Sequence, residues 1–171
     1  MLHRTSSRNG LRIPTAFDEM NRGKQGMAIR AITLDDRMAW NRLWQDYQTF
    51  YKVSIAPDVS ALTFGRFLDP AEPMHCSLVL QEGEPIGFVH FIYHRSTWTS
   101  GDYCYLQDLF VDGAHRGHGL GRRLIEHVYE TAKAAGASRV HWLTHETNTD
   151  AMLLYDRIAD RSGFVQFRKV F

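Results

Sequence analysis

Hydrophobic residues along the chain follow two spacings, one typical of β-strands and one typical of α-helices. Short runs rich in β-branched and aromatic residues predict strands at residues 28–33, 75–80, 86–94, 103–111, 138–146 and 164–171. Spacings of three and four residues predict helices after Thr33 or Asp35, from Ser60 to Asp69, from Leu120, and from Asn148 or Thr149. Helices that lie between strands in the second half of the chain predict a mixed α/β sheet.

The same spacings predict which helix faces are buried. The first helix carries an aromatic stripe that we interpret as core: Trp40, Leu43, Trp44, Tyr47 and Tyr51. The third helix should bury Leu120, Leu124, Val128, Ala132 and Ala135, and Gly136 is well placed to end it. On the last helix, Met152, Tyr155 and Ile158 should face inward, with Gly163 beyond its end.

Residues 1–26 differ from the rest of the chain. They are polar, contain several glycines and show neither helical nor strand periodicity, and they lack the apolar run of a signal peptide. We expect a flexible leader at 1–26 and a single domain at 27–171.

Composition narrows the possible partners and compartments. The net charge of +1 argues against a general nucleic-acid binder, and no apolar run is long enough to cross a membrane. Cys76 and Cys104 match no zinc or redox spacing, which favours ordinary thiols in the cytoplasm. His141 and His145 would lie ~13 Å apart on a strand, so we expect no metal site there.

The stretch HRGHGLGRR, between a predicted buried strand and a helix, is rich in glycine. Backbone N–H groups at a helix N-terminus favour a phosphate group, and glycines allow it to approach closely. A P-loop would need Lys-Ser/Thr after its last glycine, where Arg122 and Arg123 stand instead. A dinucleotide-binding turn would need glycines two and then three residues apart, but Gly117, Gly119 and Gly121 are evenly spaced.

Arg116, Gly119 and Gly121 resemble a third pattern, the coenzyme-A pyrophosphate loop of the GNAT superfamily of N-acetyltransferases. The order of elements from 28 to 167 is also similar to that superfamily, as is the pair Asn148 and Tyr155 on the last helix. The greatest similarity is to diamine acetyltransferases and to the fungal histone, polyamine and D-amino-acid acetyltransferases. The resemblance implies an α/β (α+β) fold with a mixed, mostly antiparallel sheet flanked by helices.

The resemblance also implies a role for each part of the site. The backbone of Leu109, Phe110 and Val111 would pair with the pantetheine arm of acetyl-CoA, and an N–H of that strand would polarise the thioester carbonyl. The pyrophosphate would lie on the loop residues Arg116, Gly117, His118, Gly119, Leu120, Gly121 and Arg122. Asn148 would hydrogen-bond the pantetheine, or simply cap its helix. Tyr155 would donate to the departing thiolate, or simply belong to the core.

The general base is the point at which this chain departs from its apparent relatives. Diamine acetyltransferases use a glutamate on the fourth strand, and the matching residue here is Gln107, which cannot accept a proton. Asp108 is adjacent but should point to the opposite face unless a β-bulge re-aims it. His145 and Glu146 are further candidates, and we favour Asp108.

The implied activity is transfer of acetyl from acetyl-CoA to a primary amine by direct attack, without a metal. The acceptor could be a polyamine, a lysine side chain or a small amino compound. Gln107 raises one alternative, a catalytically impaired coenzyme-A-binding regulatory module. By resemblance we expect a cytoplasmic homodimer (nuclear if the acceptor is a histone) with no nucleic-acid or membrane partner.

Overall fold

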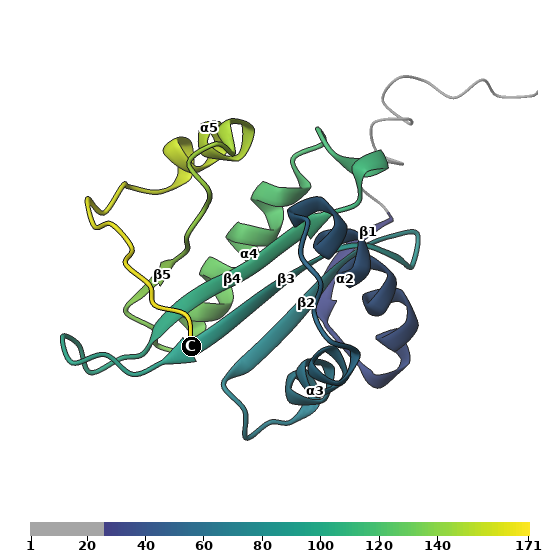
Figure 1. The fold of residues 1–171 in the computed structure, drawn as a ribbon, viewed down its shortest axis with the longest axis horizontal. Helices are drawn as coiled ribbons and strands as arrows, with labels where there is room; N and C mark the ends of the chain where they lie inside the picture. The colour runs from purple at the N-terminus through teal and green to yellow at the C-terminus, as the bar shows by residue number, and fades with distance from the viewer. Residues whose placement is uncertain (1–25) are drawn as a thin grey trace, which may run out of the picture.

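The structure, a computed structural model, describes residues 26–171, so almost all of the expected leader lies outside the described residues. Five strands form one sheet in the order of the sequence: β1 (Met27–Ala31), β2 (Met74–Gln81), β3 (Glu84–His94), β4 (Tyr103–Val111) and β5 (Arg139–His141). Adjacent strands from β1 to β4 run antiparallel to one another, and β5 runs parallel to β4. Figure 1 shows this sheet at the centre of the molecule.

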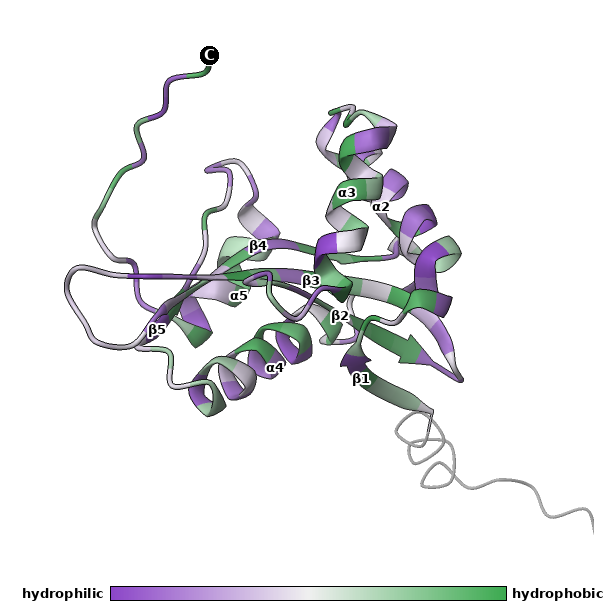
Figure 2. Ribbon diagram, turned by 90° about the horizontal axis from the view of Figure 1, so that it is seen from below, coloured by the Kyte–Doolittle hydropathy of each residue, from purple (hydrophilic) through white to green (hydrophobic). Residues whose placement is uncertain are grey.

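Helices cover both faces of the sheet. They are the 3-10 turn η1 (Leu34–Asp36), α2 (Arg37–Tyr51), α3 (Pro57–Leu68), the 3-10 turn η2 (Gly113–His115), α4 (Leu120–Ala134) and α5 (Thr149–Ile158). In Figure 2, α2 and α3 lie on one face of the sheet and α4 lies on the other. The expected mixed, mostly antiparallel fold is therefore confirmed.

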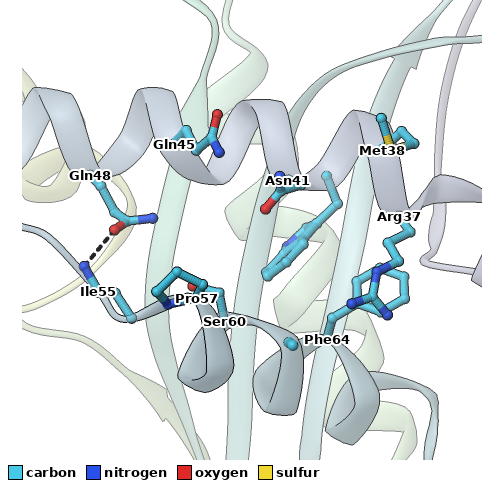
Figure 3. Close-up of a pocket in the computed structure, with 11 residues that line it drawn as sticks. Arg37, Met38, Asn41, Gln45, Gln48, Ile55, Pro57, Ser60 and Phe64 are labelled. Carbon is cyan, nitrogen blue, oxygen red and sulfur yellow. Dashed lines mark hydrogen bonds between the residues drawn. The ribbon is translucent and has the colours of Figure 1, made fainter.

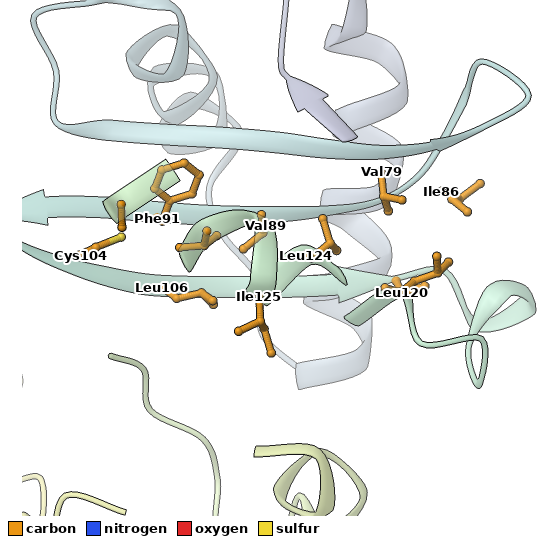
Figure 4. Close-up of a cluster of buried hydrophobic side chains, with 12 residues drawn as sticks. Val79, Ile86, Val89, Phe91, Cys104, Leu106, Leu120, Leu124 and Ile125 are labelled. Carbon is orange, nitrogen blue, oxygen red and sulfur yellow. The ribbon is translucent and has the colours of Figure 1, made fainter. Parts of the chain in front are cut away.

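Two hydrophobic clusters hold these layers together. On the α4 face, Leu124 and Val128 are completely buried against strand residues such as Val89, as Figure 4 shows in part. On the α2 face, Trp40, Leu43 and Trp44 are buried with Phe64 of α3. The expected stripes of α2 and α4 are thus mostly core, with Tyr51 and Ala135 exposed at their C-terminal ends, whereas Met152, Tyr155 and Ile158 of α5 are only half-buried.

Three predicted boundaries were wrong. The helix expected at Ser60 begins at Pro57, whose fixed φ suits the first helical turn, and Ser60 instead accepts a buried hydrogen bond from Trp44 Nε1 at 3.1 Å. The strand expected at 138–146 contains only Arg139–His141. The strand expected at 164–171 is absent: these residues pair with no described strand, and Phe164 and Phe167 are 76% and 91% exposed.

Candidate active site

The glycine-rich loop lies immediately before α4. Gly117 and Gly119 have φ angles of +82° and +75°, which glycine adopts without strain, and a Cβ on either would meet no atom within 4 Å. The first helical bond of α4 runs from Arg123 N to Gly119 O at 3.1 Å. The N–H groups of residues 120–122 therefore have no carbonyl within the helix to bind, and they form an open, positively polarised site of the kind that suits a pyrophosphate.

The two arginines at the loop, Arg116 and Arg122, make different contacts. Arg116 Nε donates to Val111 O at 2.9 Å, and its guanidinium lies 4.8 Å from the ring centre of Phe50 and 5.3 Å from that of Phe110. It thus holds the loop against β4 and the end of α2. Arg122 is exposed and pairs with Glu126 at 2.7 Å, within reach of solvent. The loop's anion-binding capacity therefore comes first from its backbone.

One edge of β4 is partly open. β5 pairs with Tyr103, Cys104 and Tyr105, and beyond these the β5-facing edge of β4 pairs with no strand among residues 26–171. This unpaired stretch includes Leu109, Phe110 and Val111, and within it Val111 O accepts from Arg116 Nε. An extended molecule can hydrogen-bond to such an edge as an additional strand.

A β-bulge changes which way β4 presents its side chains. His90 lies opposite Asp108 and Phe91 lies opposite Leu106, so Gln107 has no partner on β3. Leu106 and Leu109 consequently contact the α4-face cluster, whereas Asp108 contacts Tyr47 of α2. This is the β-bulge that was needed to turn the Asp108 side chain to the other face of β4. Gln107 is exposed within the bulge.

Asp108 lies in a largely buried hydrogen-bonded cluster. Its Oδ1 accepts from the Tyr47 hydroxyl at 2.5 Å, and its Oδ2 lies 3.0 Å from His90 Nδ1. On the other side of that ring, Trp40 Nε1 donates to His90 Nε2 at 3.0 Å. The Asp108 side chain is 12% exposed and that of His90 is 3% exposed, so only the carboxylate reaches solvent to any extent.

Tyr155, the proposed donor to the thiolate, lies on α5 and is half-buried. Its ring packs edge-on against Trp142 at 5.3 Å, and burial, followed by the nearby Tyr51, raises its pKa. The pKa of Tyr51 is in turn raised by burial first and by Asp108 second. Tyr51 is therefore within electrostatic reach of both candidate catalytic residues.

The remaining candidates lie on the loop before α5. Asn148 occupies the N-cap position of α5, as the capping alternative expected, but its side chain makes no capping bond and instead donates to Thr144 Oγ1 at 3.3 Å. His145 is exposed and bonds locally to Thr147, and Glu146 is also exposed. Neither of these two joins the cluster around Asp108.

Three residues of this cluster are not predicted as site residues by the sequence pattern. Tyr47 and Trp40 fit a core stripe, and His90 carries no motif. A usable signal was present, because a histidine inside the apolar run 86–94 must find a hydrogen-bond partner once its strand is buried. Sequence alone does not say which partner.

A separate groove lies between α2 and α3. It has a volume of about 270 Å³ and is lined by polar residues such as Asn41 and Gln45 and by apolar ones such as Ile55 and Pro57, as Figure 3 shows. Gln48 Oε1 closes one end by accepting from Ile55 N at 2.7 Å. Neither Asp108, Tyr155 nor the glycine loop lines this groove, so it is distinct from the site at β4.

The open edge of β4 and the glycine loop before α4, on this sheet, define a coenzyme-A-dependent acyltransferase domain. The chain belongs to the acetyltransferase (GNAT) family, which matches residues 40–159. It is therefore an acyl-CoA-dependent N-acetyltransferase, and the predicted superfamily and activity are confirmed. No helix within residues 26–171 is long and apolar enough to cross a membrane.

Individual proteins show the same relationship. The chain is 37% identical over 145 residues to the D-amino-acid N-acetyltransferase HPA3 of Saccharomyces cerevisiae. The matched region covers 84% of this chain and 90% of that protein. It is 36% identical over 75 residues to the thialysine N-epsilon-acetyltransferase of Caenorhabditis elegans, covering 44% and 46% of the two chains. Its fold matches that of the aminoglycoside N-acetyltransferase AAC(6')-Iy in complex with CoA, with a TM-score of 0.70, 20% identity, and coverage of 84% and 94%.

Proposed function

We propose that this enzyme transfers acetyl from acetyl-CoA to the primary amine of a small amino compound by direct attack. The observation that carries the proposal is the placement of Asp108, which the bulge at Gln107 turns onto the α2 face beside the open edge of β4. The similarity to enzymes named for D-amino acids and thialysine favours an amino acid or a related amine as the acceptor. Polyamines and lysine side chains remain within the same chemistry.

The cofactor site fits this role. Bound acetyl-CoA supplies an activated acetyl thioester. The open loop at Gly117 and Gly119 and the first N–H groups of α4 would hold its pyrophosphate, and the free edge of β4 would hold the pantetheine arm. An N–H on that edge is also suitably placed to stabilise negative charge on the carbonyl oxygen during attack.

Asp108 is the proposed general base. An alkylammonium with a pKa near 10.4 must lose a proton before it attacks, which costs about 4–5 kcal/mol at pH 7. Asp108 takes that proton from the ammonium nitrogen, directly or through one water, and the neutral amine then attacks the carbonyl carbon. As the carbon–sulfur bond breaks, the electron pair leaves with the coenzyme-A sulfur, and the second proton of the attacking nitrogen passes to that sulfur or to water, which gives the amide and free coenzyme A.

Tyr155 is the proposed donor to that sulfur. Even an ordinary phenol would lose about 2 kcal/mol by transferring its proton to a thiolate, and burial raises the pKa of Tyr155 further. Full proton transfer is thus disfavoured, and a hydrogen bond that stabilises the thiolate is the better role. The raised pKa also keeps the hydroxyl protonated throughout the neutral range.

The proposal is tested by following free-thiol release from acetyl-CoA with a panel of amines. The panel contains D- and L-amino acids, lysine, thialysine, spermidine and a histone-tail peptide. We expect turnover with small amino compounds and none with their N-blocked forms. Absence of turnover across the panel, with coenzyme-A binding intact in calorimetry, would contradict the proposed acceptor class.

We also propose a cytoplasmic homodimer. Five large apolar residues of the C-terminal segment are 76% or more exposed: Phe164, Val165, Phe167, Val170 and Phe171. Exposed apolar residues gathered in one segment are typical of an interaction surface. A second copy is a suitable partner, because this segment has strand composition and β5 is a short edge strand that could accept it. The free, buried Cys76 and Cys104 suit a reducing compartment.

A further inference from the structure

We infer that His90, with its protonation fixed by Trp40, is a positioning residue that orients the Asp108 carboxylate for proton transfer. The inference rests on the proposed role of Asp108 as the base. It concerns two buried residues that act on the site through Asp108: His90 hydrogen-bonds to the carboxylate, and Trp40 hydrogen-bonds to His90.

The indole of Trp40 fixes the protonation of His90. An indole N–H can only donate, so His90 Nε2, at 3.0 Å, must accept and carries no hydrogen. In neutral imidazole the hydrogen then lies on Nδ1, which donates to Asp108 Oδ2 at 3.0 Å. A doubly protonated His90 would set two donors against each other at Trp40.

Four hydrogen-bonding groups therefore form a chain that begins and ends on the same helix. Trp40 of α2 bonds to His90 of β3, His90 to Asp108 of β4, and Asp108 to Tyr47, two turns further along α2. Each Asp108 oxygen is held by a different donor, so the plane of the carboxylate is fixed. Each oxygen keeps a second lone pair with which to accept a proton from the substrate.

The other ionisable groups near Asp108 do not compete with it as proton acceptors. Burial is the first cause that raises the pKa of each of them, so they stay uncharged in the neutral range: Tyr47, Tyr51, Tyr105 and Cys76. Burial lowers the pKa of His90, in agreement with the neutral form that Trp40 imposes. Arg116 is a nearby cation: it lowers the pKa of Tyr51, whereas Asp108 raises it.

The test compares two substitutions at His90. His90→Asn places an amide N–H where Nδ1 was and keeps the donor to Asp108, whereas His90→Phe keeps the ring and removes the donor. We expect kcat/KM of His90→Asn to stay within about 5-fold of wild type. For His90→Phe we expect a fall of about 10- to 100-fold, an unchanged KM for acetyl-CoA, and an acidic limb of the kcat/KM profile moved to higher pH, because the carboxylate loses a donor that favours its charged form.

His127→Phe is the matched control. His127 is partly buried, whereas His90 is buried, and it likewise hydrogen-bonds to a side chain, Ser77 Oγ at 3.0 Å, but it lies on α4, which packs on the other face of the sheet. Both Phe variants should lower Tm, and only His90→Phe should move the acidic limb. A His90→Phe enzyme with a lower Tm and the wild-type limb would show that His90 is merely structural and would overturn the inference.

Two further variants keep the result clear. If His90→Phe does not fold, Trp40→Phe removes the indole donor, releases the tautomer and should move the limb in the same direction by a smaller amount; an unmoved limb would overturn the inference. Asp108→Asn separates this inference from the proposed function. Wild-type turnover in Asp108→Asn refutes Asp108 as the base and the inference with it. A large loss in Asp108→Asn beside a wild-type profile in His90→Phe refutes the inference alone.

Discussion

The two faces of the sheet around β4 are built from the same strands but have different interiors. On the α4 face, Leu124, Val128 and their strand neighbours form an apolar cluster, and the buried polar Ser77 on this face is paired with His127 of α4. On the α2 face, an equally buried cluster encloses His90 and, at its edge, Asp108. Burying a polar group is unfavourable unless it is hydrogen-bonded, so the second face is stable only because each polar atom has a partner. The first face holds the fold together, and the second does so while carrying the proposed base.

The largest effect on the reactive face should come from Asp108→Asn. This variant keeps the shape of the side chain and removes the base, so kcat/KM should fall by about 100- to 10,000-fold, or about 2.7–5.4 kcal/mol. The acidic limb of the pH profile should flatten, because the group whose ionisation produces it is gone. Steady-state kinetics from pH 5 to 9 measure both, and a normal profile would refute the aspartate.

The complementary change on the apolar face is Leu124→Ala. Leu124 has no exposed surface, and its truncation should lower the free energy of unfolding by about 2–5 kcal/mol. In the remaining folded enzyme, kcat and the pH profile should be unchanged, because this face holds no reacting group. Urea denaturation and kinetics at low temperature provide the measurement. A changed pH profile would show that the two faces are not independent.

Tyr155→Phe tests the leaving-group side of the site. The ring and its contact with Trp142 remain, so stability should change little. Loss of the hydroxyl should lower kcat by about 10- to 1,000-fold, or about 1.4–4 kcal/mol, with a much smaller change in coenzyme-A affinity. Because burial raises the pKa of Tyr155, its ionisation should not produce a basic limb below pH 10. Wild-type turnover in Tyr155→Phe would refute the role.

Substitutions at Gly121 test whether the glycine loop binds the cofactor, and they introduce no backbone strain because Gly121 does not have a positive φ. A Cβ there would lie 3.7 Å from Leu109 and 4.0 Å from Leu154, which is ordinary contact, so Gly121→Ala should bind coenzyme A almost normally. Gly121→Leu extends into the space between β4 and α5 and should weaken binding by about 10- to 100-fold. Calorimetry measures both variants. Equal affinities would place the cofactor elsewhere.

The sequence predicted much of the fold but less of the site. The apolar periodicity located the elements around Leu43 and Leu124, and the glycine pattern located the cofactor loop, because both signals are local. The bulge at Gln107 could not be predicted, since it depends on how β4 pairs with β3. The contact between His90 and Asp108 depends on the same register. The error at 164–171 has a related cause: strand composition alone does not provide a strand beside which to pair.

The smallest expected effect comes from Gln107→Glu, the change that restores the relatives' carboxylate one residue before Asp108. Gln107 is exposed within the bulge, and its carboxylate variant lies outside the hydrogen bonds that Tyr47 and His90 provide to Asp108. We expect kcat/KM to change by less than about 3-fold in the single variant. The double variant Gln107→Glu with Asp108→Asn is the sharper test, and we expect it to remain as slow as Asp108→Asn alone. Recovery of most of the lost rate, measured at pH 7 to 9, would show that water carries the proton to either carboxylate. In that case a carboxylate at either position could act as the base, because both positions lie close to the thioester. The placement of Asp108 on the α2 face would then affect stability but not catalysis.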